Sequence, residues 1–148
     1  MAVGKRVMSA RAVILENDSA LLPDSDYKAY LDSFFDEKHL AFHPTDKPTR
    51  FMIRQLTDEQ KDAIANQGND HRASARMSIR CGLVGIQNYL VQKEDGSEIE
   101  WPQPEMIDDP RLGKIIADKW IRDAGFLTDQ LVALYVLIDK FSEAHRPL

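Results

Sequence analysis

The chain has 148 residues, which is enough for one domain whose core needs neither disulfides nor metals. Its 24 acidic and 19 basic residues give a net charge of -5, and no long basic stretch interrupts this mixture, which speaks against direct binding of nucleic acid. A single cysteine, Cys81, excludes an internal disulfide, and no apolar run is long enough for a signal peptide or a membrane span. We therefore expect a protein of the cytoplasm in which it is made.

The beginning of the chain has the weakest secondary-structure signal. Val13 and Ile14 suit either a short helix or a short strand, and Asn17-Asp18-Ser19 is typical of a turn. We expect an N-terminal arm over residues 1–23 that orders against a partner, because chain ends often lack order of their own. A single, mainly helical domain is expected over residues 24–148.

A group of aromatic residues follows candidate helix caps at residues 23–26. The expected helix carries on one face Tyr27, Tyr30, Leu31, Phe34 and Phe35. Such a face usually packs against the protein's own core. Four aromatic residues in one short helix are also typical of a surface that docks on another chain, so both interpretations stay open.

A strand and a helix are expected next. Residues 49–56 alternate in part between apolar and polar side chains, with Phe51 and Ile53 on one face, and this pattern predicts a strand. A helix is expected to begin at Thr57, because Gln60 stands where it completes a capping box.

A second helix is expected from about Ala73 to Cys81, where Cys81 is a small buried packing residue. Arg72, Arg76 and Arg80 form a stripe along it at four-residue spacing. Arginines so placed suit phosphates, but in an acidic chain they more often form a solvated or ion-paired face.

The last third of the chain predicts a hairpin and two helices. Residues 82–89 are expected to break the preceding helix, and Asp95-Gly96 between two half-apolar runs predicts a β-hairpin. One helix is expected over Pro110–Ala124, since Pro110 suits a first helical position. Another is expected to begin at a cap formed by Thr128.

This terminal helix has the strongest apolar face in the chain, with Leu131, Leu134, Tyr135, Ile138 and Phe141. A face of this width is typical of a central helix or of one shared with a partner chain. Together the elements predict an α+β fold that is mainly α, in which helices pack with a short β-hairpin or a small antiparallel sheet.

Residues that could serve in catalysis or metal binding are present, but they lack the spacing of known catalytic and metal-binding motifs. His39 and His43 stand four residues apart, but Pro44 ends any helix there and no third ligand follows. The sequence contains no nucleophile elbow, phosphate-binding glycine loop, dinucleotide fingerprint or paired-cysteine zinc motif. We expect no catalytic residue, no metal and no cofactor, and hence no enzyme; a small enzyme with an unrecognised site beside His39 or Cys81 is the alternative.

Two segments resemble a known family. Residues 48–59, Pro-Thr-Arg-Phe-Met-Ile-Arg-Gln-Leu-Thr-Asp-Glu, resemble the strand and LT-x-E helix that open the tail assembly chaperone-like proteins of tailed bacteriophages. Residues 80–89, with Asp95-Gly96 after them, are similar to a pattern of small phage morphogenesis proteins, in which a basic helix and Gly-Leu-Val-Gly precede a charged hairpin. With the C-terminal helix pair the resemblance covers residues 48–142. Residues 1–47 have no counterpart, and Ile86 stands where an aromatic residue is common.

The resemblance implies non-enzymatic work in tail morphogenesis. A tail assembly chaperone binds the tape-measure protein and recruits tail-tube subunits, which requires apolar surfaces that mask a partner's helix. The implied partners are phage tail, neck or baseplate proteins, in a homo-oligomer or a hetero-complex, in the host cytoplasm during assembly or in the virion. The residues expected to contact them are Tyr27, Tyr30, Leu31, Phe34, Phe35, Leu131, Leu134, Tyr135, Ile138 and Phe141.

Two alternatives stay open. One is a structural virion component of the neck, tail or baseplate. The other is a nucleic-acid-binding regulator that uses Arg72, Arg76 and Arg80.

Overall fold

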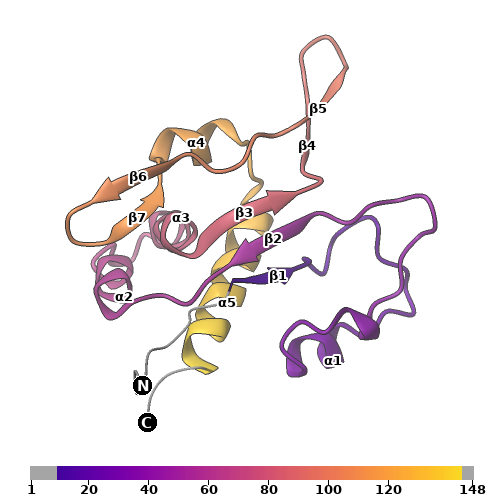
Figure 1. Ribbon diagram of the computed structural model, residues 1–148, viewed down its shortest axis with the longest axis horizontal. Helices are drawn as coiled ribbons and strands as arrows, with labels where there is room; N and C mark the ends of the chain where they lie inside the picture. Colours follow the sequence, from indigo (N-terminus) through magenta and orange to yellow (C-terminus); the bar gives the residue numbers. More distant parts are fainter. Residues whose placement is uncertain (1–9, 145–148) are drawn as a thin grey trace, which may run out of the picture.

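The computed structural model describes residues 10–144, and a small antiparallel sheet lies at its centre (Figure 1). In this sheet β2 (Arg50–Ile53) lies between β1 (Arg11–Val13) and β3 (Leu83–Gln87). Two separate hairpins follow it in the chain, β4 (Leu90–Gln92) with β5 (Glu98–Glu100) and β6 (Met106–Asp109) with β7 (Gly113–Ile116). The helices are α1 (Tyr27–Asp32), the short 3-10 helix η1 (Glu37–His39), α2 (Asp58–Ala65), α3 (His71–Gly82), α4 (Asp118–Asp123) and α5 (Thr128–Ala144).

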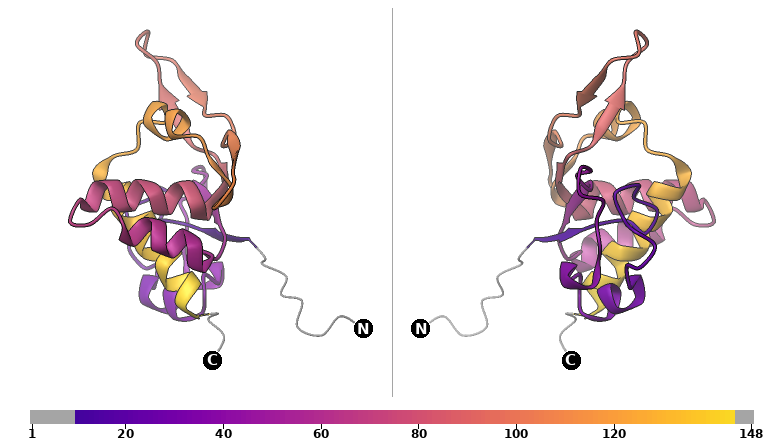
Figure 2. Two further views of the ribbon diagram at one scale, coloured as in Figure 1. Left: turned by 90° about the vertical axis from the view of Figure 1, so that its left-hand side faces the viewer. Right: turned by 90° about the vertical axis from the view of Figure 1, so that its right-hand side faces the viewer.

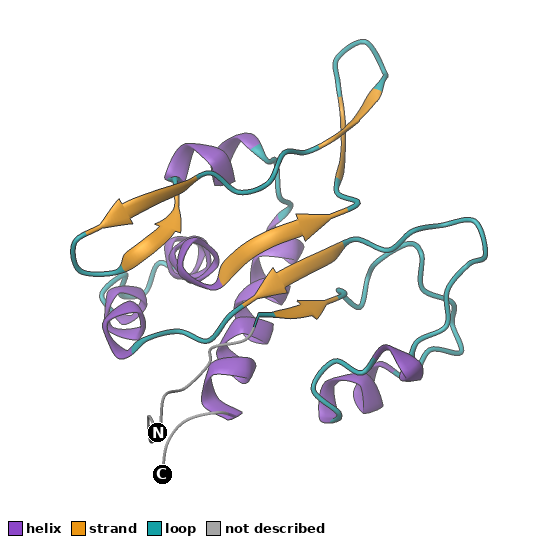
Figure 3. Cartoon of the chain, in the orientation of Figure 1, coloured by secondary structure: helices purple, strands orange, loops and turns teal. Residues whose placement is uncertain are grey.

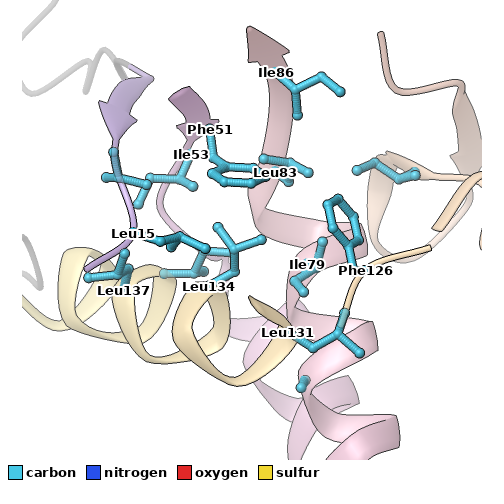
Figure 4. Packing of buried hydrophobic residues seen from close by; sticks show 14 of the residues in the cluster. Leu15, Phe51, Ile53, Ile79, Leu83, Ile86, Phe126, Leu131, Leu134 and Leu137 are labelled. Carbon is cyan, nitrogen blue, oxygen red and sulfur yellow. The ribbon is translucent and has the colours of Figure 1, made fainter. Parts of the chain in front are cut away.

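The core lies between the sheet and α5 (Figure 4). Phe51 and Leu83 point from the strands toward Leu134 and Leu137 of α5, and Leu15 fills the space beside them. These side chains are all buried, so their apolar surface supplies the main stabilisation of the fold. None of the helices between residues 10 and 144 is long and apolar enough to cross a membrane.

The expectation of a mainly α fold is wrong. Residues 10–144 are 38% helical and 21% strand, and their strands form three small antiparallel sheets (Figure 3). The fold is therefore α+β without a dominance of helices. Two segments account for the difference, since strands occupy residues expected to form a helix or to break one.

The first is the expected helix over Pro110–Ala124, of which only α4 is helical. The carboxylate of Asp109 accepts the backbone N–H groups of Arg111 and Leu112, each at 2.8 Å. These bonds form a turn in place of a first helical turn. Gly113 completes the turn with a φ of 79°, which glycine adopts without strain.

The second is residues 82–89, which form β3 and not only a break. α3 passes into β3 without a loop, and Leu83 and Ile86 are buried in the sheet. At the junction Gly82 lets α3 approach α5, because a Cβ added to Gly82 would lie 2.6 Å from Cγ2 of Ile138.

Several expected elements are confirmed. β2 forms where alternation predicts it, and the capping box closes through two bonds between Thr57 and Gln60, at 2.9 and 3.2 Å. The expected hairpin is β4–β5, in which Val91 pairs with Ile99, and it projects from the body of the molecule (Figure 2). α5 begins at Thr128 itself, and the side chain of Gln130 binds the preceding backbone N–H of Leu127 at 2.9 Å.

The expected N-terminal arm over residues 1–23 is described from residue 10 onward. There, β1 pairs with β2, and Ile14 and Leu15 are buried in the core of the same chain. This part is thus ordered against the chain itself. The prediction for residues 1–9 lies outside the described residues, as do residues 145–148.

Candidate functional site

A groove of about 380 Å³ opens at one end of the central sheet. Four segments meet there: the turn after β1, the residues before β2, the end of β3 and the start of α5 (Figure 1). The groove is lined by Leu15, Asn17, Asp18, Ser19, Lys47, Thr49, Phe51, Asn88, Tyr89, Leu90, Leu127 and Gln130.

The groove combines a buried apolar floor with an exposed apolar rim. Leu15, Phe51 and Tyr89 are buried beneath it. On the rim, Leu90 is 56% exposed and Leu127 is 69% exposed. Two exposed leucines beside one hollow form a surface that gains free energy when a partner's apolar group covers it.

Asn88 fixes the wall from which Leu90 projects. Its φ of 59° turns the chain sharply between β3 and β4. Its backbone oxygen accepts the hydroxyl of Thr49 at 2.9 Å, and its side chain donates to the backbone oxygen of Pro48 at 3.2 Å. Its N–H donates to a carboxylate oxygen of Glu100 at 3.3 Å. Three anchored groups of Asn88 make this wall preformed.

Asp18 holds the opposite wall. Its two carboxylate oxygens accept the backbone N–H groups of Ala20 and Thr49, each at 2.9 Å. The carboxylate therefore joins the turn after β1 to the residue before β2.

Aromatic packing attaches the start of α5 to the sheet. The rings of Tyr89 and Phe126 lie 5.1 Å apart, and Phe51 is 6.0 Å from Phe126. The hydroxyl of Tyr89 donates to the backbone oxygen of Ala124 at 2.9 Å. Burial raises the pKa of Tyr89, so it keeps this proton at neutral pH. The position of Leu127 on the rim follows from this packing.

The groove has the chemistry of a binding surface. Lys47 is its cationic side chain, and the other free polar groups are amides and hydroxyls. Elsewhere in residues 10–144, no group of three or more His, Cys, Asp or Glu side chains is placed to hold a metal ion. The expected burial of Cys81 is confirmed, and it raises the pKa of the thiol to about 11, which opposes thiolate chemistry.

The residues expected to contact partners lie mostly in the core. Buried among them are Tyr30, Phe35, Leu131, Leu134, Ile138 and Phe141. Half-buried are Tyr27, Leu31, Phe34 and Tyr135. Their role in binding a partner stays a prediction, and in the folded chain a partner reaches only the second group.

The structure brings the two expected surfaces together. α1 ends at Asp32, and Phe34 and Phe35 follow with φ values of 56° and 71°. The ring of Phe35 then lies 5.6 Å from Tyr30 and 6.2 Å from Phe141 of α5. Lys140 of α5 stands over the ring of Phe34, with its Nζ 5.6 Å from the ring centre. Each surface therefore covers part of the other.

The sequence pattern does not identify the rim leucines as exposed. Leu127 stands four residues before Leu131, in register with the apolar face of α5, but it precedes the first residue of the helix and is 69% exposed. Leu90 begins a short strand. Comparisons of the chain with models of protein families, with curated proteins and with solved structures give no match.

Proposed function

We propose that the chain is a non-enzymatic protein of bacteriophage tail morphogenesis, similar to a tail assembly chaperone, that binds an apolar segment of a partner protein in the groove between Leu90 and Leu127. The observation that carries the proposal is the pair of exposed leucines over an apolar floor. The phage setting is supported by the resemblance of residues 48–142, and the partners are then the tape-measure protein and tail-tube subunits. Binding takes place in the host cytoplasm during assembly.

The hairpin beside the groove also favours a partner. β4 begins at Leu90 on the rim, and β4 and β5 pair only with each other within the described residues. A two-stranded ribbon is marginally stable by itself. A segment lying in the groove would contact the base of this ribbon and stabilise it.

The groove matches a segment of a few residues. Pockets of about 300–1,000 Å³ bind drug-sized groups, which corresponds to two or three side chains. Full burial of an exposed leucine side chain contributes about 1.5–3 kcal/mol. Since Leu90 and Leu127 are 56% and 69% exposed, covering either one contributes about 1–2 kcal/mol, or roughly fivefold to thirtyfold in affinity.

Binding to co-expressed tape-measure protein and tail-tube subunits, measured by affinity capture and titration, tests the proposal. Leu90→Asp and Leu127→Asp are expected to weaken binding at least about tenfold, because each places a charge on the apolar rim. Val136→Asp is the matched control, since Val136 is 57% exposed on α5 and does not line the groove.

The outcomes separate the two parts of the proposal. No retention of either protein by the unchanged chain refutes the tail-assembly role. Retention that Leu127→Asp and Val136→Asp reduce equally refutes the groove. Detection of the chain in purified particles by mass spectrometry would favour the alternative of a structural virion component of the neck, tail or baseplate.

A further inference from the structure

A second hollow lies between α3 and the connection from α4 to α5. Its volume is about 190 Å³. Its lining residues are Arg72, Arg76, Ile121, Arg122, Gly125, Phe126 and Leu131. Three arginines therefore line one small space whose remaining lining is apolar apart from Gly125.

The positive charge in this hollow is only partly neutralised. Arg122 forms an ion pair with Asp118, with Nε 2.7 Å from the carboxylate oxygen. Within residues 10–144 neither Arg72 nor Arg76 has an acidic partner within 4.0 Å. Since they stand four residues apart on α3, their like charges repel each other along the helix. An anion between them would remove this repulsion.

In the described part of the chain, the fold leaves one donor of Arg76 without an acceptor. Its Nε is buried and has no hydrogen-bond partner within the described residues. A buried N–H of a charged group is costly to leave without an acceptor. Arg76 also lines an adjoining hollow of about 310 Å³ with Arg80 and Asp118, so this residue borders two hollows.

Arg80, four residues after Arg76 on α3, does have a hydrogen-bond acceptor within the fold. Nε of Arg80 donates to the backbone oxygen of Ile116 at 2.8 Å, which joins α3 to β7. Arg80 is thus a structural residue, whereas Arg72 and Arg76 retain donors for another molecule.

We infer that Arg72, Arg76 and Arg122 bind an oxyanion, a carboxylate or phosphate group that carries a small apolar substituent. Guanidinium groups bind both kinds of oxyanion through paired N–H donors. The substituent contacts the wall of Ile121, Phe126 and Leu131. The site goes beyond the proposed function and does not depend on it, because none of the three arginines lines the groove.

Size and charge favour such a group over a nucleic-acid strand. A water molecule occupies about 30 Å³ in the liquid, so the hollow holds roughly the volume of six waters, which suits one oxyanion and a few carbon atoms. The acidic residues Asp70, Asp118 and Asp123 lie on the same elements or at their caps. They repel the further phosphates of a duplex.

Titration of the full chain with phenyl phosphate, followed by NMR of the arginine Nε–H resonances and by calorimetry, tests the inference. We expect the Nε–H resonances of Arg72 and Arg76 to shift on binding. Arg76→Gln and Arg72→Gln should each weaken binding by roughly tenfold to a hundredfold, the loss expected for a charge-assisted hydrogen bond. Arg111→Gln, on the exposed β6–β7 turn, is the matched control and should leave binding unchanged.

Arg72 is exposed, so its variant keeps the test valid if Arg76→Gln disturbs folding. Inorganic phosphate is expected to bind more weakly than phenyl phosphate, because it lacks the apolar substituent. Equal binding by the unchanged chain and both glutamine variants overturns the inference. Tighter binding of a twelve-base-pair DNA duplex at the same arginines also overturns it and assigns the stripe to nucleic acid.

Discussion

Tyr30 distinguishes a structural role of the aromatic helix from a docking role. Its hydroxyl oxygen accepts the backbone N–H of Ile14 at 2.9 Å, just beyond the end of β1, and both residues are fully buried. Tyr30→Phe keeps the ring and leaves this N–H without an acceptor, which costs about 1–3 kcal/mol. Tyr27 donates to the backbone oxygen of Ile14 at 2.6 Å but is only half-buried, so Tyr27→Phe should cost about 0.5–1.5 kcal/mol.

Urea unfolding monitored by circular dichroism measures these costs. Tyr135→Phe is the control, because Tyr135 is a half-buried tyrosine of α5 for which no hydrogen bond occurs within the described residues. The expected order of destabilisation is Tyr30→Phe, then Tyr27→Phe, then Tyr135→Phe with less than about 0.5 kcal/mol. Equal midpoints for Tyr30→Phe and Tyr135→Phe would refute the reasoning, since Ile14 would then not depend on the hydroxyl.

Two further predictions concern the core. Gly82→Ala should lower the free energy of unfolding by about 1–3 kcal/mol, because overpacking against Ile138 outweighs the gain in helix propensity of about 1 kcal/mol. Urea unfolding of this variant, with and without Ile138→Ala, measures the change in stability. A variant more stable than the unchanged chain would contradict the close approach of α3 to α5. The raised pKa of Cys81 means that the thiol ionises in the unfolded chain from pH 9.0 but in the folded chain only at about pH 11. Stability should therefore be complete below pH 9.0 and fall by an amount on the order of 2 kcal/mol as the pH rises to about 11, and Cys81→Ala, compared in the same pH series, should make this fall smaller.

The elements that sequence predicts well are those set by contacts within a few residues. The capping box of Thr57 and Gln60 is complete within the first turn of α2, and the Asp95-Gly96 turn fixes the hairpin. In each case the residues that form the hydrogen bonds also stand together in the chain. Such local hydrogen bonds do not depend on contacts with distant parts of the chain, so the sequence predicts them.

The segment from Met106 to Asp123 shows where periodicity stops being informative. Leu112, Ile115 and Ile116 have the spacing of a helical face, yet Ile115 and Ile116 are buried in β7. The decisive contact is the side chain of Asp109, which binds two backbone N–H groups and forms a turn. An aspartate that caps a helix and one that closes an Asx turn both accept backbone N–H groups with a carboxylate oxygen. The same sequence pattern is therefore compatible with a helix start or with a turn.

The groove could not be predicted for a different reason. It is held by hydrogen bonds between residues 31, 35 and 39 positions apart, from Asp18 to Thr49, Tyr89 to Ala124 and Thr49 to Asn88. No local pattern encodes such contacts. They exist only once the sheet and α5 have packed together.

The most periodic apolar faces of this chain are used in its own core. The aromatic residues after Asp26 and the apolar face of α5 meet at Phe35 and Phe141, because a wide apolar stripe gains most when it is buried against another stripe of the same chain. A docking surface that remains open in the folded chain must then consist of apolar residues that those stripes leave exposed. Leu90 and Leu127 meet this condition beside a preformed hollow, since Leu127 precedes the first residue of α5, whereas Val132 and Val136 are exposed on α5 without lining the hollow. For this reason the rim leucines, and not the residues of the strongest pattern, are the ones whose substitution should separate partner binding from stability.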